Sequence, residues 1–334
     1  MSDIKKFLDK YDIILFDMDG VVTSEQEYWN AAAMTSYEML VSSKYFGDKS
    51  IDASEIYEYR AQIRRNVFCD DKTTEVLKNK GVNSNWDLAY VVLSEALLDE
   101  EHSFENVYKR VCGYSDSIFS EYESIAKKLS SKFNKPLQYF ERCGEMWCEI
   151  RDVFQRKYHG EENILGLIND EKPLFGVGRT SAVLSALKQS GKILGIGTGR
   201  PMCEIEGPLK NWDLYKYFDA DRIVSYDDVV EAERELSAYG EKILLTKPHP
   251  FMFLKGAFTK SCPTEKIIHF EYDKDILKRT LVVGDAGADI LAAQAAGMSF
   301  LAVLTGISGT GARGYFEKQG ADYILDSICD MIEK

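Results

Sequence analysis

The sequence lacks the features that anchor a chain in a membrane or cross-link it outside the cell. No apolar run approaches the roughly 18 residues that a membrane-spanning helix needs, and the N-terminal stretch MSDIKKFLDKYD is too charged for the apolar region of a secretory signal. The seven cysteines are scattered without a CxxC pair, and Cys143 and Cys148 have no histidine near them in sequence, so no zinc-binding pattern is present. We therefore expect free thiols and a cytoplasmic protein.

Positive charge is also in short supply. The 334 residues carry a formal net charge of −13, which argues against nucleic acid or an anionic membrane as a partner. An anionic small molecule stays compatible with this charge, because a local cation or metal ion can outweigh a distant acidic surface. The hydrophobic content of 45% is typical of a globular protein, and the length favours two domains.

The chain contains one long stretch of helical periodicity. Residues from position 25 to about 170 predict helix after helix, and the segment WDLAYVVLSEALLDEE, which starts at Trp86, is one apolar example. Phe104, Val107, Tyr108 and Val111 fall on one helical face. Such an aromatic stripe is typical of the core of a helix bundle rather than of a ligand site.

From Pro173 onward, short apolar strands alternate with helices. The segments KILGIG, LVVG, SFLAVLTG and ADYILD predict strands, and SAVLSALKQSG, closed by Gly191, predicts a helix. This rhythm indicates βαβ units and a parallel sheet, which the apolar strand ending at Phe16 is expected to join. The predicted fold is a doubly wound, Rossmann-like α/β core from residues 1–23 and 171–334, interrupted by an all-helical insertion over residues 24–170.

Four segments at or near the ends of the predicted strands carry polar residues. In an open parallel sheet, chemistry gathers at the carboxyl ends of the strands. The four segments are Asp17-Met18-Asp19, Thr198-Gly199-Arg200, Lys247-Pro248, and Gly284-Asp285 with Asp289. Each alone is a weak signal. A calcium loop starting at Asp17 is excluded, because its twelfth position holds Tyr28 instead of glutamate.

Together and in this order, the four segments resemble the motifs of the haloacid-dehalogenase-type (HAD) phosphotransferases. The resemblance is to the branch of phosphoglycolate phosphatase and β-phosphoglucomutase: FDMDGVV is similar to the first motif, GIGTGR to the second, KPHP to the third and VVGDAGADILAAQAAGM to the fourth. It does not extend over most of the helical insertion.

The resemblance implies that Asp17 attacks phosphorus and becomes an aspartyl-phosphate, while Asp19 protonates the leaving oxygen and later deprotonates water. Positions i and i+2 of a strand share a face, but a turn at the strand end would equally aim both carboxylates at one phosphate. The sequence leaves these two arrangements open.

Two carboxylates that face a phosphate dianion need a cation, and Mg²⁺ is the natural choice. The resemblance assigns it to Asp17, the backbone carbonyl of Asp19, Asp285 and, directly or nearby, Asp289. It also implies that the substrate phosphate is contacted by Thr198, Gly199, Arg200 and Lys247, with Lys247 pairing with the nucleophile.

Several positions depart from the family pattern. Ser24 stands where an aspartate is common, Glu25 where a serine or threonine is common, Gly199-Arg200 where asparagine or lysine more often follows the threonine, and Ala286 where a serine is common. These departures leave the four core roles intact and leave the substrate open.

The helical insertion begins where this family inserts its cap, so it is expected to act as a lid. Hinges are expected near Gly20–Glu25 and near Gly166–Pro173. Arg64, Arg65 and Arg151 are candidates for reading the substrate, although a surface role is the simpler interpretation of each.

Three functions fit the sequence. The first is a Mg²⁺-dependent phosphatase that acts on a small phosphorylated metabolite. The second is a phosphomutase, because TSEQEYW resembles the β-phosphoglucomutase hinge in spacing, with Glu27 and Tyr28 in matching places. The third is a non-catalytic binding protein, which a lost nucleophile or lysine would support; neither is lost.

Overall fold

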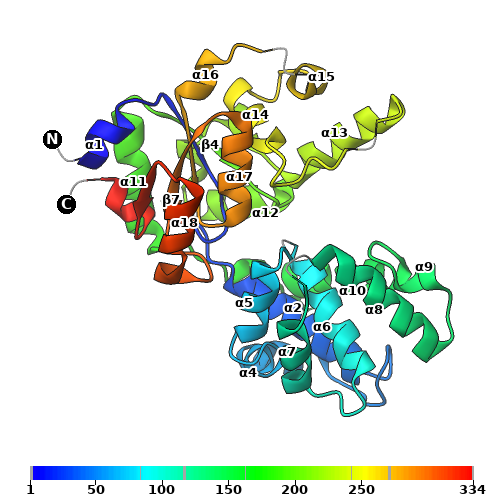
Figure 1. Ribbon diagram of the computed structural model, residues 1–334. Helices are drawn as coiled ribbons and strands as arrows, with labels where there is room; N and C mark the ends of the chain where they lie inside the picture. The colour runs from blue at the N-terminus through cyan, green and yellow to red at the C-terminus, as the bar shows by residue number, and fades with distance from the viewer. Residues whose placement is uncertain are drawn as a thin grey trace. The chain divides into compact units, whose positions relative to one another are not determined.

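The chain forms two compact units (Figure 1). The computed structural model describes residues 3–82, 84–115, 118–161, 163–241, 243–269 and 272–332. One unit, here called the core unit, consists of residues 1–24 and 172–334, and the other, the inserted unit, consists of residues 25–171.

A parallel sheet of six strands lies at the centre of the core unit, in the order β5-β4-β1-β6-β7-β8. The strands are β1 (Ile13–Phe16), β4 (Ile193–Gly197), β5 (Ile223–Val224), β6 (Thr280–Gly284), β7 (Ser299–Val303) and β8 (Tyr323–Leu325). The predicted α/β fold with a doubly wound parallel sheet is confirmed, including the place of the N-terminal strand. The edge strand β5 was not predicted.

Helices cover both faces of this sheet. They are α1 (Asp3–Leu8), α11 (Gly176–Gln189), α12 (Met202–Asn211), α13 (Tyr226–Ala238), α14 (Phe251–Phe258), α15 (Thr264–Ile268), α16 (Asp275–Lys278), α17 (Gly287–Ala296) and α18 (Arg313–Gln319). Side chains of β1 alternate between two apolar layers: Ile14 and Phe16 pack with α1, α11 and α12, whereas Ile13 and Leu15 pack with α13, α14 and α17. All four are buried, as expected for a central strand of a parallel sheet.

The inserted unit has a hydrophobic core of its own. Its helices are α2 (Gln26–Val41), α3 (Ala53–Glu58), α4 (Arg60–Val67), α5 (Lys72–Asn79), α6 (Asn85–Leu98), α7 (Phe104–Cys112), α8 (Ile118–Phe133), α9 (Leu137–Phe140) and α10 (Glu145–His159). Phe104, Val107 and Val111 are buried in that core, which confirms the packing predicted for these three, whereas Tyr108 is half-buried and outside the cluster.

The inserted unit is not entirely helical. A two-residue antiparallel pair, β2 (Gly160–Glu161) with β3 (Ile164–Leu165), follows α10, so the expectation of an all-helical insertion is wrong at this point. Such short strands are set by a local turn and leave no periodic pattern in the sequence. Within the described ranges, every helix is too short or too polar to cross a membrane.

The two chain segments that connect the units are paired with each other. The backbone N–H of Leu174 donates to the carbonyl of Val22 at 2.9 Å, and Thr23 forms an antiparallel bridge with Pro173. The chain therefore leaves and re-enters the core unit at neighbouring points.

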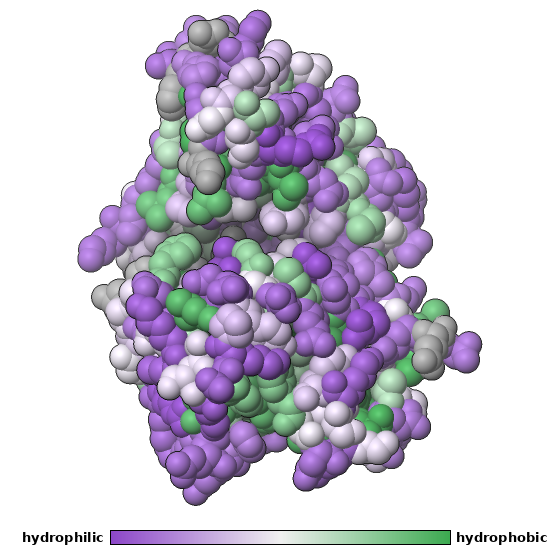
Figure 2. Space-filling view, turned by 90° about the vertical axis from the view of Figure 1, so that its right-hand side faces the viewer, coloured by the Kyte–Doolittle hydropathy of each residue, from purple (hydrophilic) through white to green (hydrophobic). Residues whose placement is uncertain are grey.

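Hydrophilic side chains cover most of the face seen in Figure 2, and hydrophobic ones gather on it in small groups. Single exposed apolar side chains are usual on globular proteins.

Candidate active site

The chain turns sharply as soon as β1 ends at Phe16. The carbonyl oxygen of Met18 accepts hydrogen bonds from the backbone N–H groups of Val22 at 2.9 Å and Thr23 at 2.8 Å. Gly20 takes a left-handed conformation, with φ of +74°, that a side chain would disfavour. Of the two arrangements that the sequence left open for the first two aspartates, the structure shows the turn.

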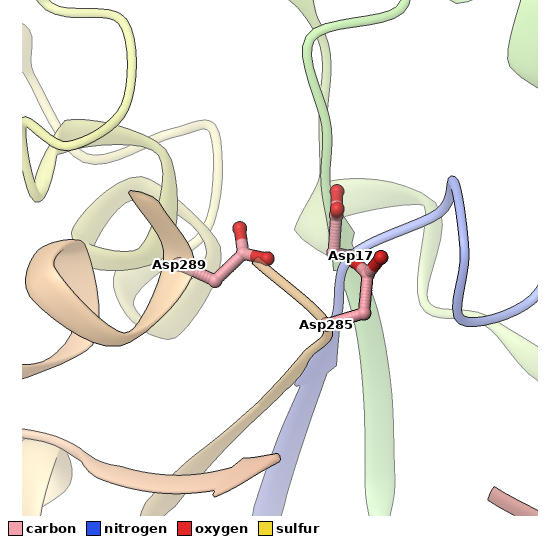
Figure 3. A group of neighbouring side chains, drawn as sticks. All are labelled: Asp17, Asp285 and Asp289. Atoms are coloured by element: carbon pink, nitrogen blue, oxygen red, sulfur yellow. The ribbon is translucent and has the colours of Figure 1, made fainter. Parts of the chain in front are cut away.

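Three carboxylates converge beside this turn. Asp17 follows β1, Asp285 follows β6, and Asp289 lies in the first turn of α17. One oxygen from each lies within 4.8 Å of the others, and Figure 3 shows the three carboxylates together at the ends of the strands. An all-oxygen group of this kind has the chemistry that Mg²⁺ prefers.

Two glycines make room for Asp285. A Cβ atom on Gly20 would lie 2.2 Å from Oδ2 of Asp285, and one on Gly306 would lie 2.3 Å from the same atom. The hydroxyl of Thr305 donates to the carbonyl of Gly20, which ties the loop after β7 to the turn after β1. The Asp285 carboxylate is therefore enclosed by backbone on both sides.

Lys247 bridges two of the three carboxylates. Its Nζ lies 2.8 Å from Oδ1 of Asp17 and 2.7 Å from Oδ1 of Asp289, and its side chain is 6% exposed. Burial by itself lowers the pKa of Lys247, but the charges of Asp17 and Asp289 outweigh burial and hold that pKa above its usual value. The lysine is therefore a fixed positive charge at this site.

One lysine does not balance the three carboxylates. Burial raises the pKa of Asp17 to about 7, and the negative charge of Asp289 adds to this effect while Lys247 opposes it. Three carboxylates beside one lysine leave an excess of negative charge, which burial makes costly. A divalent cation would remove that excess, so the residues present fit Mg²⁺.

Asp19 has a different partner. Both of its oxygens accept from Nε of Arg200, at 3.1 Å for Oδ1 and 2.9 Å for Oδ2, and Oδ1 also accepts from a terminal nitrogen of Arg200. The hydroxyl of Thr23 lies 3.1 Å from Oδ1 of Asp19. The Asp19 side chain thus belongs to a pair with Arg200 and not to the three-carboxylate group.

The predicted residues of the second motif lie at the end of β4, beside β1. Thr198 is 1% exposed, and its Oγ1 accepts from the backbone N–H of Arg200 at 3.3 Å. Gly199 is exposed, with open space where a Cβ would lie. The structure therefore places Thr198 and Gly199 at the strand ends, whereas the Arg200 side chain is directed to Asp19.

Sequence reasoning missed Thr23, Thr305 and Gly306. The last two follow β7, in the segment SFLAVLTG, so the rule that chemistry gathers at strand ends already applied to them. Thr23 gave no comparable signal, because a threonine after two valines is common in any buried segment.

Of the three arginines considered for the inserted unit, Arg65 is exposed, and the other two have partners there. Arg64 donates to both oxygens of Asp71, at 2.8 and 2.6 Å, and its guanidinium lies 4.8 Å from the centre of the Trp29 ring. Arg151 pairs with its exposed neighbour Asp152 at 2.8 Å. These contacts give Arg64 and Arg151 roles within their own unit.

Comparisons with known proteins agree with this geometry. The sequence profile of the HAD-hydrolase-like family matches residues 244–331, which include Lys247, Asp285 and Asp289. The chain is 24% identical over 242 residues to pyrophosphatase PpaX of Bacillus mycoides (strain KBAB4), across 72% of this chain and 87% of that protein.

Solved structures align over nearly the whole chain. The X-ray structure of Northeast Structural Genomics Consortium target ZR25 has a TM-score of 0.77 and 27% identity, and the alignment covers 96% of this chain and 97% of that one. A predicted phosphoglycolate phosphatase from Haemophilus somnus aligns over 96% of each chain, with 17% identity and a TM-score of 0.48. The first, second and fourth motifs lie at the ends of strands of one parallel sheet, and the family match covers the last two motifs, so the chain is similar to the HAD-like hydrolases and is an enzyme.

Proposed function

We propose that this protein is a Mg²⁺-dependent phosphatase that hydrolyses a small phosphorylated metabolite through an aspartyl-phosphate on Asp17. The observation that carries the proposal is the position of Asp17, bonded to Lys247 at 2.8 Å and grouped with Asp285 and Asp289 at the strand ends. The similarity to HAD-like hydrolases and to a pyrophosphatase supports the same reaction.

Asp17 is the proposed nucleophile. One of its carboxylate oxygens forms a bond to phosphorus while the bond from phosphorus to the leaving oxygen breaks. Lys247 orients this carboxylate and offers positive charge to the phosphoryl oxygens, and Thr198 is placed to donate to one of them. Mg²⁺, held by Asp17, Asp285, Asp289 and the Asp19 carbonyl, would neutralise charge on the phosphoryl group.

Asp19 is the proposed acid and base. It gives a proton to the leaving oxygen in the first step and takes a proton from water in the second. That water attacks phosphorus, the bond to Asp17 breaks, and phosphate leaves with the Asp17 carboxylate restored. The same carboxyl group thus regains in the second step the proton that it lost in the first.

The inserted unit is proposed to act as the cap over this site. In this proposal residues 1–23 and 171–334 form the catalytic core, and residues 24–170 form the cap. A cap would exclude water while the leaving group departs and would contact the part of the substrate beyond the phosphate. The proposed substrate class is a small phosphorylated metabolite. The similarity to a pyrophosphatase makes pyrophosphate one compound to include in a substrate screen. A cytoplasmic location remains a prediction from the scattered cysteines.

A substrate screen tests the proposed reaction. Phosphate release would be measured with pyrophosphate, sugar phosphates, nucleotides and phosphoglycolate, first with EDTA and then with excess Mg²⁺. We expect activity only with Mg²⁺, no turnover by Asp17→Asn, and labelling of Asp17 by beryllofluoride in the unmodified enzyme alone.

Two results would contradict the proposal. Full activity in metal-free buffer would remove the metal assignment, and wild-type turnover by Asp17→Asn would remove the nucleophile. Interconversion of sugar phosphates without hydrolysis would establish a phosphomutase instead.

A further inference from the structure

We infer that Arg200 is a positioning residue that fixes the carboxylate of Asp19 for proton transfer, and that it does not bind the substrate phosphate. This inference rests on the proposed function, because it assigns Arg200 a role through the proposed acid and base. It replaces the substrate-binding role that the resemblance implied for Arg200.

The first argument is the geometry of the ion pair. Nε of Arg200 lies 3.1 Å from one oxygen of Asp19 and 2.9 Å from the other, and a terminal nitrogen bonds to the first oxygen as well. Two adjacent nitrogens of one planar group therefore hold one carboxylate. Such a fork restricts both the rotation and the tilt of the carboxylate, which a single hydrogen bond does not.

The second argument is how the guanidinium is engaged. It also donates to the hydroxyl of Thr23 at 3.2 Å and to the backbone carbonyl of Glu204 at 3.3 Å. All three nitrogens of Arg200 thus donate to the protein, and the side chain is 2% exposed. A guanidinium that is enclosed and bonded in this way is poorly placed to bind a phosphate that arrives from solvent.

The third argument is the difference in exposure between the partners. The Asp19 side chain is 20% exposed, whereas Arg200 is enclosed. Asp19 also lies in the turn next to Gly20, where the hydroxyl of Thr23 is a further hydrogen-bond partner. The pair therefore consists of an accessible carboxylate on a buried support. This arrangement suits a group that must meet both a leaving oxygen and a water molecule from one position.

Thr23 completes the support. Its hydroxyl accepts from Arg200 and can donate either to Oδ1 of Asp19 at 3.1 Å or to the carbonyl of Met18 at 3.0 Å. The residue is fully buried. Replacing Thr23 with valine keeps its shape and removes only the hydroxyl, which makes it a milder probe of the same support.

The test compares leaving groups in a double-mutant cycle. Arg200→Lys, Asp19→Asn and the double variant would be assayed with p-nitrophenyl phosphate, whose leaving group needs little protonation, and with an alkyl phosphate, whose leaving group needs much. The value compared is kcat/KM, which reports the first step, because the second step is the same for both esters. Since proton transfer contributes about 10²–10⁴-fold, we expect Arg200→Lys to lower kcat/KM for the alkyl ester by about 10- to 100-fold and for the aryl ester by several-fold less.

The decisive measurement is the effect of Arg200→Lys in the Asp19→Asn variant. If Arg200 acts through Asp19, adding Arg200→Lys there should cost less than about 2-fold, because the group that it positions no longer transfers a proton. A merely structural arginine would lower kcat/KM in both backgrounds and with both esters alike.

Arg222→Lys is the matched control. Arg222 is also a largely buried guanidinium of the core unit, and it donates to the carbonyl oxygens of Gly256 at 2.8 Å and of Ala257. We expect this variant to change the melting temperature without changing the ratio of the two ester rates. Should Arg200→Lys not fold, Thr23→Val takes its place, with a smaller loss in the same pattern.

The inference is overturned if the change in Arg200 or Thr23 lowers kcat/KM equally for both esters, or lowers it as much in the Asp19→Asn background. The proposed function fails separately, and this inference with it, if the unmodified enzyme hydrolyses no phosphate ester in the presence of Mg²⁺.

Discussion

Asp285 fits among the strand ends because the two residues that flank its carboxylate carry no side chain. A Cβ on Gly306 would lie 2.3 Å from Oδ2 of Asp285, far inside van der Waals contact. We expect Gly306→Ala to displace this carboxylate and to weaken Mg²⁺ binding by about 10-fold or more, because divalent-cation sites depend on ligand geometry. Isothermal titration of the purified protein with Mg²⁺ would measure the change.

Gly311→Ala serves as the control for this variant. It lies in the same loop region, and a Cβ there would meet open space. Its Mg²⁺ affinity should match that of the unmodified protein. Equal affinities for all three proteins would show that Asp285 does not need the room that Gly306 provides.

The raised pKa of Asp17 predicts how metal binding depends on pH. In the metal-free protein this pKa is about 7, because of burial first and the charge of Asp289 second. Mg²⁺ binds the ionised carboxylate, so binding must release a proton below that pH. We expect the Mg²⁺ affinity to rise by about 10- to 30-fold from about pH 5.5 to about pH 8 and then to level off.

The folded protein without metal should show the opposite trend in stability. A pKa raised above the ordinary 3.8 means that the folded state binds the proton more tightly than the unfolded chain does. The contribution of Asp17 to the free energy of unfolding therefore falls as pH rises from about 4 to about 7. For the metal-binding prediction, titrations with Mg²⁺ in buffers of different ionisation enthalpy would report the released proton. The same Mg²⁺ affinity at about pH 5.5 and at about pH 8 would contradict that prediction.

For single residues, the sequence was a better guide to which side chains lie together than to the contacts that each one makes. Asp17 and Asp285 follow neighbouring strands of the sheet, Asp289 lies in the helix after β6, and Lys247 lies between α13 and α14. The fold brings the four together, and their chemical roles stay predictions. Nothing in the letters GTGR says whether the guanidinium of Arg200 turns toward substrate or toward Asp19. That choice depends on the turn after β1, which is a property of the folded chain.

Neighbouring elements pack closely on β1. A Cβ on Gly195 of β4 would lie 2.7 Å from a methyl group of Leu15, and one on Gly256 of α14 would lie 3.1 Å from Leu15. A neighbouring strand and a helix thus both approach this fully buried side chain. We expect Leu15→Ala to lower the free energy of unfolding by about 2–5 kcal/mol, as for other large-to-small core changes.

Chemical denaturation monitored by circular dichroism would measure this loss. Ile193→Ala, in β4 but 37% exposed, should cost less than about 1 kcal/mol. Similar costs for the two variants would mean that the packing on Leu15 contributes little.

The sequence predicted those helices and strands whose apolar residues recur at a regular spacing or whose ends are marked by a residue such as glycine. The helix predicted by SAVLSALKQSG and closed by Gly191 corresponds to α11, and KILGIG corresponds to β4. The helix α14 gave no period, because seven of its eight residues, in the run FMFLKGAF, are buried on all sides. The two residues of β5 are too few for alternation to show.

On the scale of the whole molecule, each unit has its own hydrophobic core. The buried residues of the inserted unit form one cluster, and those of the core unit form two others, one on each face of the sheet. We therefore expect residues 25–171 to fold when expressed alone. Circular dichroism should show a helical protein with a cooperative thermal transition, and a chain without such a transition would show that this unit depends on the rest of the molecule.

The pairing of Val22 with Leu174 has a further consequence for how such a protein can change over generations. Because entry and exit are neighbours, the register of the sheet is the same whether the chain between them is short or long. Lineages could lengthen, shorten or exchange the insertion while Asp17 and Asp285 stay in place at the strand ends. Selection for a new substrate could then act on one module without being opposed by selection for the chemistry in the other.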